Sequence, residues 1–335
     1  MKFMKNNSIK EKVKVLITSA GSTNGVNVIK ALREQKKIKL SLIAVDMNPL
    51  AAGFFMADKY YVVPKADATD FIPTILKICK EEKIKIIIPT FSYELPFFAK
   101  NKEIFEKEKI KMAIPSYKNY LITEDKIKTY GYFKKQEIPF PKIYSKKEIK
   151  EKKVKFPVII KPIKGSGSKE VTRINNWKDL IFFTNYFQNS IVQEFVEGQE
   201  YTVDGVSNLK GKMIAASPRI RLETKGGLAV KSITIFDSQI VNYTKKIVEG
   251  LNIIGPFNAQ CFKKGKIIKF IEVNSRFPSG GLPLTVKAGL NIPLIIIKFL
   301  LGKKIEKPRI KENIIMTRYW DAIIIKKVKN KYKIL

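Results

Sequence analysis

The hydrophobic and polar positions in the first part of the chain follow two alternating patterns. Short, mostly apolar runs predict β-strands at residues 13–20, 40–46 and 84–90. Between them, apolar residues recur every three or four positions, which predicts helices with one buried face at residues 25–35, 71–83 and 94–109. Strands that alternate with helices indicate βαβ units, so this part is predicted to be an α/β domain with a parallel sheet.

The pattern becomes irregular in the rest of the chain. A helix is predicted over residues 123–136, with Thr123 as its N-cap, and a proline-broken link follows it. From Phe156 onward, strands, glycine turns and short helices mix without regular alternation, as in an α+β domain. A single strand over residues 316–328 is predicted to close the chain.

The composition is that of a globular protein with an excess of positive charge. The chain has 335 residues, 45% of them hydrophobic, which is enough for two or three domains. Its formal net charge is +34, but the lysines are scattered through nearly every segment, which favours solvated helix faces. We therefore expect attraction to anionic substrates, such as a nucleoside triphosphate, and no specific nucleic-acid or membrane partner. A nucleic-acid-binding module is the alternative.

Several kinds of chemistry and location are disfavoured by what the sequence lacks. The chain contains no histidine, which excludes Ser/His/Asp hydrolases and histidine bases or metal ligands. Cys79 and Cys261 lie in separate apolar segments, as expected of buried free thiols. The N-terminal residues lack the apolar core of a signal peptide, and the longest apolar run, 292–302, is broken by Lys298. A cytoplasmic protein is the expectation.

The segment "TSAGSTNGVNVIKAL" follows a predicted strand and opens a helix. Gly21 and Gly25 are available for a tight turn, and Asp46 ends the next strand, where a ribose-binding acid would lie in a dinucleotide site. The full GxGxxG pattern is missing. A scaffold domain or substrate wall is therefore favoured over an NAD site.

Two segments in the middle of the chain are candidates for nucleotide contacts. In "FPVIIKPIKGSGSKEVTRI" a strand ends at Lys161, and a glycine- and serine-rich loop of phosphate-binding type follows, formed by Gly165, Ser166, Gly167 and Ser168. The alternative for this segment is an ordinary hairpin turn. In "IVQEFVEGQEYTVDGV", the backbone near Glu194 and Val196 can meet an adenine edge and Glu200 can accept ribose hydroxyls, unless this is a solvated acidic turn.

A third candidate site combines "NAQCF" with "KFIEVNSRFPSGG". Gln260, Glu272 and Asn274 are predicted to lie on two neighbouring strands, and all three offer the oxygen ligands that suit Mg²⁺. A carboxylate near the end of an apolar strand is costly unless it is paired or binds a metal. The alternative is an ion pair between Glu272 and Arg276.

These four segments, in this order, resemble the ATP-grasp superfamily, and specifically its carbamoyl-phosphate-synthase-like branch. The resemblance covers nearly the whole chain and includes Asp125–Lys126 in the predicted helix and "AGLNIP" near the end. It implies a fold of α/β and α+β class. A Rossmann-like pre-ATP-grasp domain would span residues 1–115, followed by an ATP-grasp subdomain with the glycine-rich loop at 116–190 and a second subdomain with the metal site at 191–335.

The resemblance also implies roles for individual residues. Lys126 and Lys161 would contact the ATP phosphates, and the loop from Gly165 to Ser168 would close over them. Glu194 and Val196 would frame the adenine, and Glu200 would bind the ribose. Two Mg²⁺ ions, or Mn²⁺ in their place, would be held by Gln260, Glu272 and Asn274. Arg276 would neutralise the transferring phosphoryl group or the acyl phosphate.

The function that follows is an ATP-dependent ligase. It would join a small-molecule carboxylate to an amine through an acyl phosphate, releasing ADP and phosphate. Arg219 and Arg221 are candidates to clamp the carboxylate, although alternating arginines also occur on solvated strand faces. The rival functions are formation of carboxyphosphate or carbamoyl phosphate and, from another class, an NAD-dependent oxidoreductase. A homodimer is the assembly considered.

Overall fold

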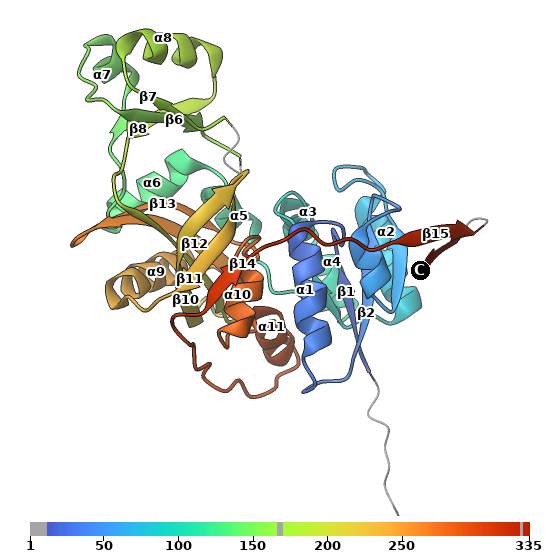
Figure 1. Cartoon of the computed structure of the whole chain (residues 1–335). Coiled ribbons are helices and arrows are strands. Elements are labelled where there is room, and N and C mark those ends of the chain that lie inside the picture. Colours follow the sequence, from blue (N-terminus) through green and yellow to red (C-terminus); the bar gives the residue numbers. More distant parts are fainter. Residues whose placement is uncertain (1–11, 166–169, 329–330) are drawn as a thin grey trace, which may run out of the picture. The chain divides into compact units, whose positions relative to one another are not determined.

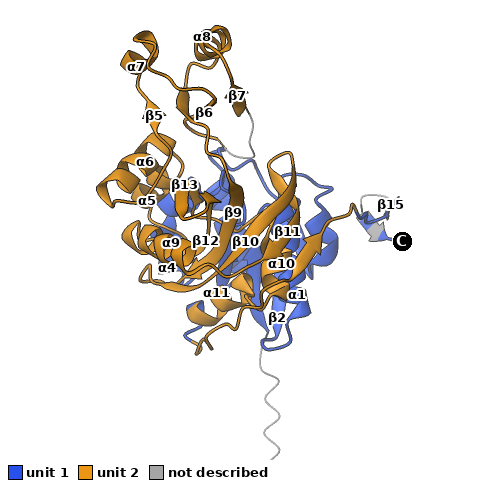
Figure 2. Cartoon of the chain, turned by 60° about the vertical axis from the view of Figure 1, so that its left-hand side comes forward, with its two compact units in different colours: residues 1–112, 300–302, 321–335 blue, residues 113–299, 303–320 orange. Residues whose placement is uncertain are grey.

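The computed structural model describes residues 12–165, 170–328 and 331–335 (Figure 1). The chain divides into two compact units (Figure 2). The first unit comprises residues 1–112, 300–302 and 321–335, and the second comprises residues 113–299 and 303–320. Within the described part of the chain, no helix is both long enough and apolar enough to span a bilayer.

The first unit contains the predicted parallel sheet. Its strands are β1 (Val13–Ile17), β2 (Leu40–Asp46), β3 (Lys59–Val62) and β4 (Ile86–Ile88), in the order β3-β2-β1-β4. Its helices are α1 (Thr23–Glu34), α2 (Phe71–Glu82), α3 (Leu95–Lys100) and α4 (Lys102–Lys107), with a short 3₁₀ helix, η1, at Ala52–Met56. Val15, Leu16 and Ile17 are all fully buried, so both faces of β1 are covered, as is usual for a central parallel strand.

Two details of this unit differ from the sequence prediction. Strand β3 was not predicted, because its four residues are largely exposed and do not alternate between apolar and polar side chains. The helix predicted over 94–109 is two helices, because the backbone leaves helical geometry at Asn101, which ends α3 and precedes α4.

The second unit contains two antiparallel sheets. The small sheet is formed by β5 (Ile143–Tyr144), β6 (Val158–Pro162), β7 (Thr172–Ile174) and β8 (Ser190–Glu194), in the order β5-β8-β6-β7. The large sheet is formed by β9 (Gln199–Ser207), β10 (Met213–Lys225), β11 (Leu228–Thr234), β12 (Gly255–Lys264), β13 (Ile267–Asn274) and β14 (Ile315–Thr317), in the order β13-β12-β9-β10-β11-β14. The α/β and α+β fold class predicted from the sequence is confirmed.

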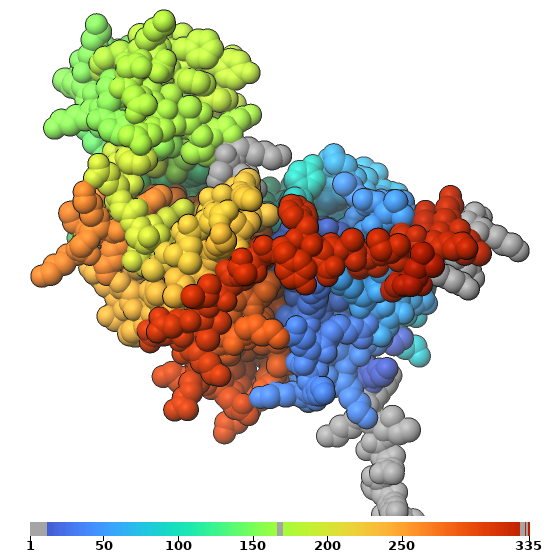
Figure 3. All heavy atoms as spheres, viewed as in Figure 1, coloured from blue at the N-terminus to red at the C-terminus, as the bar shows by residue number. Residues whose placement is uncertain are grey.

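Helices of the second unit cover the two sheets separately. They are α5 (Tyr117–Thr123), α6 (Lys126–Lys135), α7 (Lys146–Lys150), α8 (Trp177–Tyr186), α9 (Ser238–Gly250), α10 (Leu282–Lys287) and α11 (Ile292–Leu300). Helices α7 and α8 lie on the face of the small sheet that points away from the large sheet, and together they form a lobe of their own (Figures 1 and 3). Helices α6 and α9 pack their apolar faces against the large sheet.

Each sheet has its own apolar core. The small sheet's core consists of Tyr144, Val154, Val158, Ile160, Ile174, Leu180 and Val192. The large sheet's core is bigger and includes Tyr130 and Phe133 of α6, Ile247 of α9 and Phe270 of β13. Ile191 of β8 also belongs to the larger cluster, so the small sheet packs against it on one face and encloses its own core on the other.

Two further predictions in this unit are wrong. Thr123 ends α5 and does not cap the next helix, which begins at Lys126. Asp125 is its N-cap, because the carboxylate accepts hydrogen bonds from the backbone N–H groups of Ile127 and Lys128. The strand predicted over 316–328 is divided: β14 joins the large sheet, whereas β15 (Ile325–Val328) pairs with β16 (Lys331–Ile334) in the first unit.

Candidate active site

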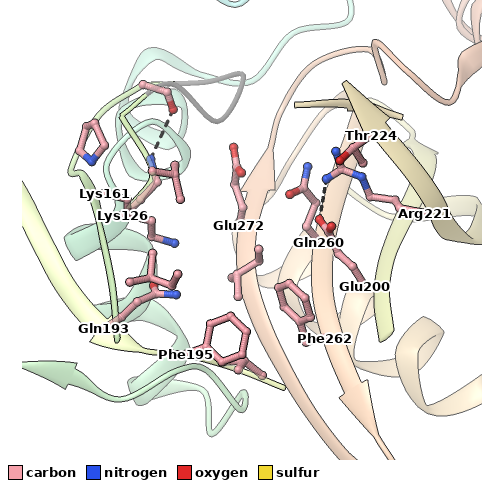
Figure 4. Close-up of a pocket in the computed structure, with 16 residues that line it drawn as sticks. Lys126, Lys161, Gln193, Phe195, Glu200, Arg221, Thr224, Gln260, Phe262 and Glu272 are labelled. Atoms are coloured by element: carbon pink, nitrogen blue, oxygen red, sulfur yellow. Dashed lines mark hydrogen bonds and ion pairs between the residues drawn. The ribbon is translucent and has the colours of Figure 1, made fainter. Parts of the chain in front are cut away.

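A cavity of about 230 Å³ lies in the second unit between the small and the large sheet (Figure 4). Side chains of β6 and β8 form one wall, and side chains of β9, β10, β12 and β13 form the other. Its lining consists of Lys126, Ile159, Lys161, Pro162, Gly165, Val171, Gln193, Phe195, Val196, Glu200, Arg221, Thr224, Gln260, Phe262, Ile271 and Glu272. Most of the residues predicted from the sequence to contact a nucleotide are thus brought together here.

Lys161 reaches the cavity because of the alternation of β6. Val158 and Ile160 point into the small sheet's core, so Ile159 and Lys161 face the other way and line the cavity. Lys161 is only 6% exposed, and its Nζ donates to the Tyr130 hydroxyl at 3.0 Å. Burial lowers the pKa of Lys161 to about 8, against the opposing influence of Glu272. A buried ammonium partnered by a neutral hydroxyl is suited to receive an anion.

The Tyr130 hydroxyl connects the two walls of the cavity. It accepts the hydrogen bond from Lys161 on β6 and lies 2.8 Å from the carbonyl oxygen of Ile271 on β13. It also lies 3.1 Å from Oε1 of Gln193 on β8, and its single proton serves one of these two acceptors at a time. Burial raises the pKa of Tyr130, so the phenol stays neutral. The Tyr130 hydroxyl therefore links β6 and β8 of the small sheet to β13 of the large sheet.

Lys126 supplies a second cation at the same end of the cavity. It is the first residue of α6, and its Nζ donates to the carbonyl oxygen of Gly165 at 3.3 Å. Gly165 has a φ of +139°, a conformation that favours glycine, at the start of the predicted phosphate loop. Ser166, Gly167 and Ser168 lie outside the described residues. Two lysines and the first residue of the loop thus converge on one end of the cavity.

The three predicted metal ligands lie on neighbouring strands of the large sheet. Gln260 on β12 is directly opposite Glu272 on β13, and both line the cavity. Asn274 is buried, and its Nδ2 donates to Oε1 of Glu272 at 2.9 Å. This bond leaves the Asn274 Oδ1 and the second Glu272 oxygen as acceptors. In the described chain, Glu272 is therefore hydrogen-bonded to Asn274, and the alternative ion pair with Arg276 is not formed.

A β-bulge sets the direction of Glu272. The register between β12 and β13 shifts after the pair Gln260–Glu272, because Cys261 pairs with Phe270 and leaves Ile271 as an extra residue. Phe270 and Val273 consequently both point into the core, although three positions separate them. Ile271 and Glu272, between them, both line the cavity. Without the extra residue, strict alternation would place Phe270 on the same face as Glu272 and so turn it away from the core.

The oxygen donors at this position fit one particular kind of metal binding. The set contains one carboxylate, on Glu272, and two neutral amides. Among all the residues that the structure describes, no three His, Cys, Asp or Glu side chains gather as a metal site. Mg²⁺ takes oxygen ligands and often binds through one or two carboxylates together with substrate phosphates. The donors therefore fit an ion that arrives with phosphates, rather than a preformed metal cage.

The opposite end of the cavity is apolar and offers strand-edge backbone. Phe195 and Val196, which follow β8, line it together with Phe262 of β12. Glu194 is not among the lining residues, because its carboxylate points away from the cavity and pairs with Lys269. The prediction that Glu194 frames an adenine therefore concerns its backbone and not its side chain.

The two arginines proposed as a carboxylate clamp both have acidic partners. Arg219 is 3% exposed, and its Nε donates to Oδ2 of the fully buried Asp204 at 2.8 Å. Arg221 lines the cavity, and its Nη1 donates to Oε1 of Glu200 at 2.5 Å. Arg219 is thus a neutralised core residue, whereas Arg221 belongs to the wall beside Glu200.

Comparison with known proteins gives two family matches. The model of a PylC-like N-terminal domain matches residues 15–113, and the model described as ATP-grasp in the biosynthetic pathway with Ter operon matches residues 186–322. The ATP-grasp model thus matches a large part of the second unit, and the PylC-like model matches most of the first. The second match includes Glu200, Gln260 and Glu272 of the cavity.

Relatives of this chain include carbamoyl phosphate synthases. The large chain from Clostridium botulinum is 27% identical over 304 residues, which are 84% of this chain and 27% of that one. The carbamoyl-phosphate synthase of Methanobrevibacter smithii is 25% identical over 280 residues, which are 78% of this chain and 74% of that protein. The chain thus spans about a quarter of the length of the first relative.

Solved structures of a carboxylase and a ligase share the fold. The biotin carboxylase domain of Hydrogenobacter thermophilus 2-oxoglutarate carboxylase, in complex with MgADP and bicarbonate, aligns with a TM-score of 0.72 and 17% identity, covering 91% of this chain and 74% of that one. The L-amino acid ligase of Bacillus licheniformis aligns with a TM-score of 0.67 and 16% identity, covering 89% and 75%. The predicted fold is therefore confirmed, and the match to an ATP-grasp model agrees with the resemblance seen in the sequence.

Several residues in or beside this cavity were not predicted from the sequence. Tyr130 follows Lys126 by four positions on α6, so the shared helix face was a usable signal for it. Gln193 and Phe262 are cavity residues whose positions depend on how the sheets pair, and no local pattern marks them.

Two arginines lie around the loop that follows β13. Arg276 does not line the cavity, and its Nη1 donates to the carbonyl oxygen of Phe277 at 3.1 Å. Burial lowers its pKa, against the opposing charges of Glu272 and Glu124. Arg318, which no local sequence pattern marks, donates from Nη2 to the carbonyl oxygen of Gly280 at 3.0 Å. The loop is thus braced by a guanidinium at each end.

In the first unit, the residues considered for a dinucleotide site bond to one another within the fold. Asp46 ends β2, and its Oδ2 accepts the backbone N–H of Gly21 at 2.8 Å while Oδ1 accepts that of Asn48 at 2.8 Å. Both carboxylate oxygens are therefore engaged in shaping the turns after β1 and β2. The preference for a scaffold role over an NAD site stays a prediction, and this arrangement supports it.

Proposed function

We propose that this ATP-grasp protein is an ATP-dependent ligase that phosphorylates a substrate carboxylate and transfers the acyl group to an amine. The observation that carries the proposal is the convergence of Lys126, Lys161 and Glu272 on one cavity between two sheets. Two cations close to a set of oxygen donors suit the phosphates of a nucleotide together with a divalent ion. Relatives and structures of this fold that are named as synthases, carboxylases and ligases support it.

At the phosphate end, the chain's own residues hold charge. Lys126 and Lys161 bind phosphate oxygens and stabilise the negative charge that spreads over the transferring group. Gln260, Glu272 and Asn274 would hold Mg²⁺, in the proposal two ions, with Mn²⁺ as a substitute. When bound, the metal neutralises phosphate charge as a Lewis acid. Arg276 would neutralise the phosphoryl group or acyl phosphate from the loop after β13.

At the other end of the cavity, apolar side chains would enclose the base, and the carboxylate of Glu200 would face the sugar. Phe195, Val196 and Phe262 would enclose the adenine, with the backbone at Glu194 and Val196 meeting its edge. Glu200 would accept hydrogen bonds from the ribose hydroxyls. This direction places the triphosphate toward Lys126 and Lys161.

The proposed reaction has two steps. A carboxylate oxygen of the substrate bonds to the γ-phosphorus while the bond from that phosphorus to the β,γ-bridging oxygen breaks, and ADP leaves. The amine nitrogen then bonds to the acyl carbon, and phosphate leaves with one former carboxylate oxygen. The nitrogen's proton passes to solvent. No histidine is needed, in agreement with its absence from the sequence.

Formation of carboxyphosphate or carbamoyl phosphate is the second candidate. It is favoured by the carbamoyl phosphate synthases, which match 84% of this chain for the first relative. In that reaction bicarbonate would replace the carboxylate and ammonia the amine. The chemistry at phosphorus is the same, so the identities of the acid and of the amine distinguish the two candidates. A homodimer of the chain is part of the proposal, in line with the dimer named for the structure from H. thermophilus.

An isotope experiment tests the reaction type. ADP release is first screened over pairs of carboxylates, including bicarbonate, and amines, including ammonia. The active carboxylate is then supplied with ¹⁸O in its carboxyl group, and we expect one labelled oxygen in the released phosphate. Release of AMP and pyrophosphate, or phosphate without label, would contradict the acyl phosphate.

A further inference from the structure

Glu200 and Arg221 form an ion pair in the wall of the cavity. They lie side by side on the antiparallel strands β9 and β10, and the Nη1 of Arg221 donates to the Oε1 of Glu200 at 2.5 Å (Figure 4). The Arg221 side chain is 7% exposed, and the Glu200 side chain is 24% exposed. A pair this sheltered keeps its geometry better than a surface ion pair.

The other end of the guanidinium is fixed to a turn. Nη2 of Arg221 donates to the carbonyl oxygen of Gly227 at 2.8 Å. Gly226 and Gly227 have φ values of +54° and +74° and form the two-residue turn that joins β10 to β11. Arg221 therefore ties the Glu200 carboxylate to this turn, so the two are held as one unit.

Two polar groups of this unit have no hydrogen-bond partner among the described residues. Nε of Arg221 is buried and has no hydrogen-bond partner among the described residues, although the side chain lines the cavity. A buried donor without a partner is costly. Because Oε1 of Glu200 is taken by Arg221, Oε2 is the oxygen left to accept from a ligand. A donor beside an acceptor matches adjacent hydroxyl groups, each of which can donate and accept.

We propose that Arg221 is the residue that makes the site selective for ribonucleotides over deoxyribonucleotides. It orients Glu200 toward the 2′ and 3′ hydroxyls of the sugar and offers its own Nε–H beside them. A site built to bond a hydroxyl rejects an analogue that lacks it, because its buried polar groups then stay unpaired. The inference rests on the proposed function, since it concerns the same nucleotide site.

The test compares dissociation constants of the whole chain for MgATP, Mg-2′-deoxyATP and Mg-3′-deoxyATP by calorimetry. We expect the unaltered protein to bind ATP at least roughly tenfold more tightly than one or both analogues, as for a hydrogen bond to a charged group. In Arg221→Gln this ratio should fall close to one, mainly through weaker ATP binding. Arg221→Lys should keep an intermediate ratio. Lys231→Gln, which removes an exposed ion pair with Glu223 on the same hairpin, should keep the full ratio.

A double-mutant cycle separates positioning from general damage. Glu200→Gln alone should also reduce the ratio, and Arg221→Gln combined with Glu200→Gln should lower it no further, because the two residues act as one unit. An unchanged ratio in Arg221→Gln, or an equal loss of affinity for all three nucleotides, would overturn this inference alone. If the unaltered protein binds none of the nucleotides, the proposed function falls together with it.

Discussion

Gln260 on β12 lies directly opposite Glu272 on β13, so an amide and a carboxylate face the cavity from adjacent strands. The amide oxygen carries no charge, which leaves Glu272 as the single carboxylate of the proposed metal set. A divalent ion is therefore expected to bind weakly to the free protein and strongly in the presence of a nucleoside triphosphate, whose phosphates supply the missing negative charge.

The first prediction concerns that carboxylate. Glu272→Gln should fold normally, because the amide is nearly isosteric and can still accept from Asn274, but Mg²⁺-dependent turnover should fall by about 100-fold or more. Circular dichroism checks the fold, and ADP release checks the activity. Turnover close to that of the unaltered protein would remove the metal role from Glu272.

The second prediction reverses the change on the facing strand. Gln260→Glu adds a second carboxylate, so the nucleotide-free protein should bind Mn²⁺ roughly tenfold more tightly, as ligand charge sets the affinity for hard cations. Electron paramagnetic resonance of added Mn²⁺ measures the free ion directly. Gln239→Glu places the same charge on an exposed position of α9 and serves as the matched control. An equal gain in both variants would mean that only net charge matters.

A pH dependence follows from Lys161. Its pKa is lowered to about 8, so the free protein loses the ammonium above pH 8, and nucleotide affinity should decline as pH rises from 7 to 9. The unfolded chain keeps that proton to higher pH, because its lysine has an ordinary pKa. The free energy of unfolding of the nucleotide-free protein should therefore rise with pH above 8. Lys161→Arg, which stays charged throughout, should show neither trend.

The Tyr130 hydroxyl allows a test of the contact between the sheets. Tyr130→Phe removes the group that Lys161 and Ile271 share, so we expect a loss of about 1 kcal/mol in unfolding free energy and weaker ATP binding. Tyr132→Phe is the control, since its hydroxyl lies on the same helix and makes only a 3.5 Å contact with the carbonyl oxygen of Lys246. Equal effects of the two substitutions would argue against a special role for Tyr130.

A further prediction lies in the first unit. Glu94 is 7% exposed and accepts a hydrogen bond from the Thr18 hydroxyl at 2.5 Å, and burial raises its pKa to about 7. The unfolded chain loses this proton at lower pH, so ionisation of Glu94 destabilises the folded protein as pH rises toward 7. Glu94→Gln should therefore melt at a higher temperature relative to the unaltered protein at pH 8 than at pH 5, by roughly 2–4 °C. The exposed Glu103→Gln should show no such pH trend.

The sequence predicted much of the site because strand and helix periods are local. The period of two placed Glu272 and Asn274 on one face, and the end of an apolar strand placed Lys161. The bulge at Ile271 was not predictable in this way, because the extra residue depends on pairing with β12, which is distant in sequence. The same holds for Gln193, which reaches the cavity only after β8 pairs with β6.

Errors in the predicted fold have equally local causes. Thr123 and Asp125 are both good N-cap residues, and the choice between them depends on α5, which ends at Thr123. The mixed apolar stretch 316–328 predicts one strand, although Tyr319 and Trp320 within it are 83% and 100% exposed. Periodicity reports which residues can be buried, and the tertiary structure decides which of them are.

The separate core of the small sheet has a consequence for how the protein opens. That core contains seven buried side chains and the larger one sixteen, so cooperative unfolding of the lobe alone should cost less free energy than global unfolding. Amide hydrogens of β6 and β8 should then exchange with solvent before those of β9 and β12. A nucleotide held by Lys161 on one side and Glu272 on the other would bind only while the small sheet is folded, so it would slow this exchange by mass action. The exchange rates of the β6 and β8 amides would thus measure the fraction of molecules whose cavity holds a nucleotide.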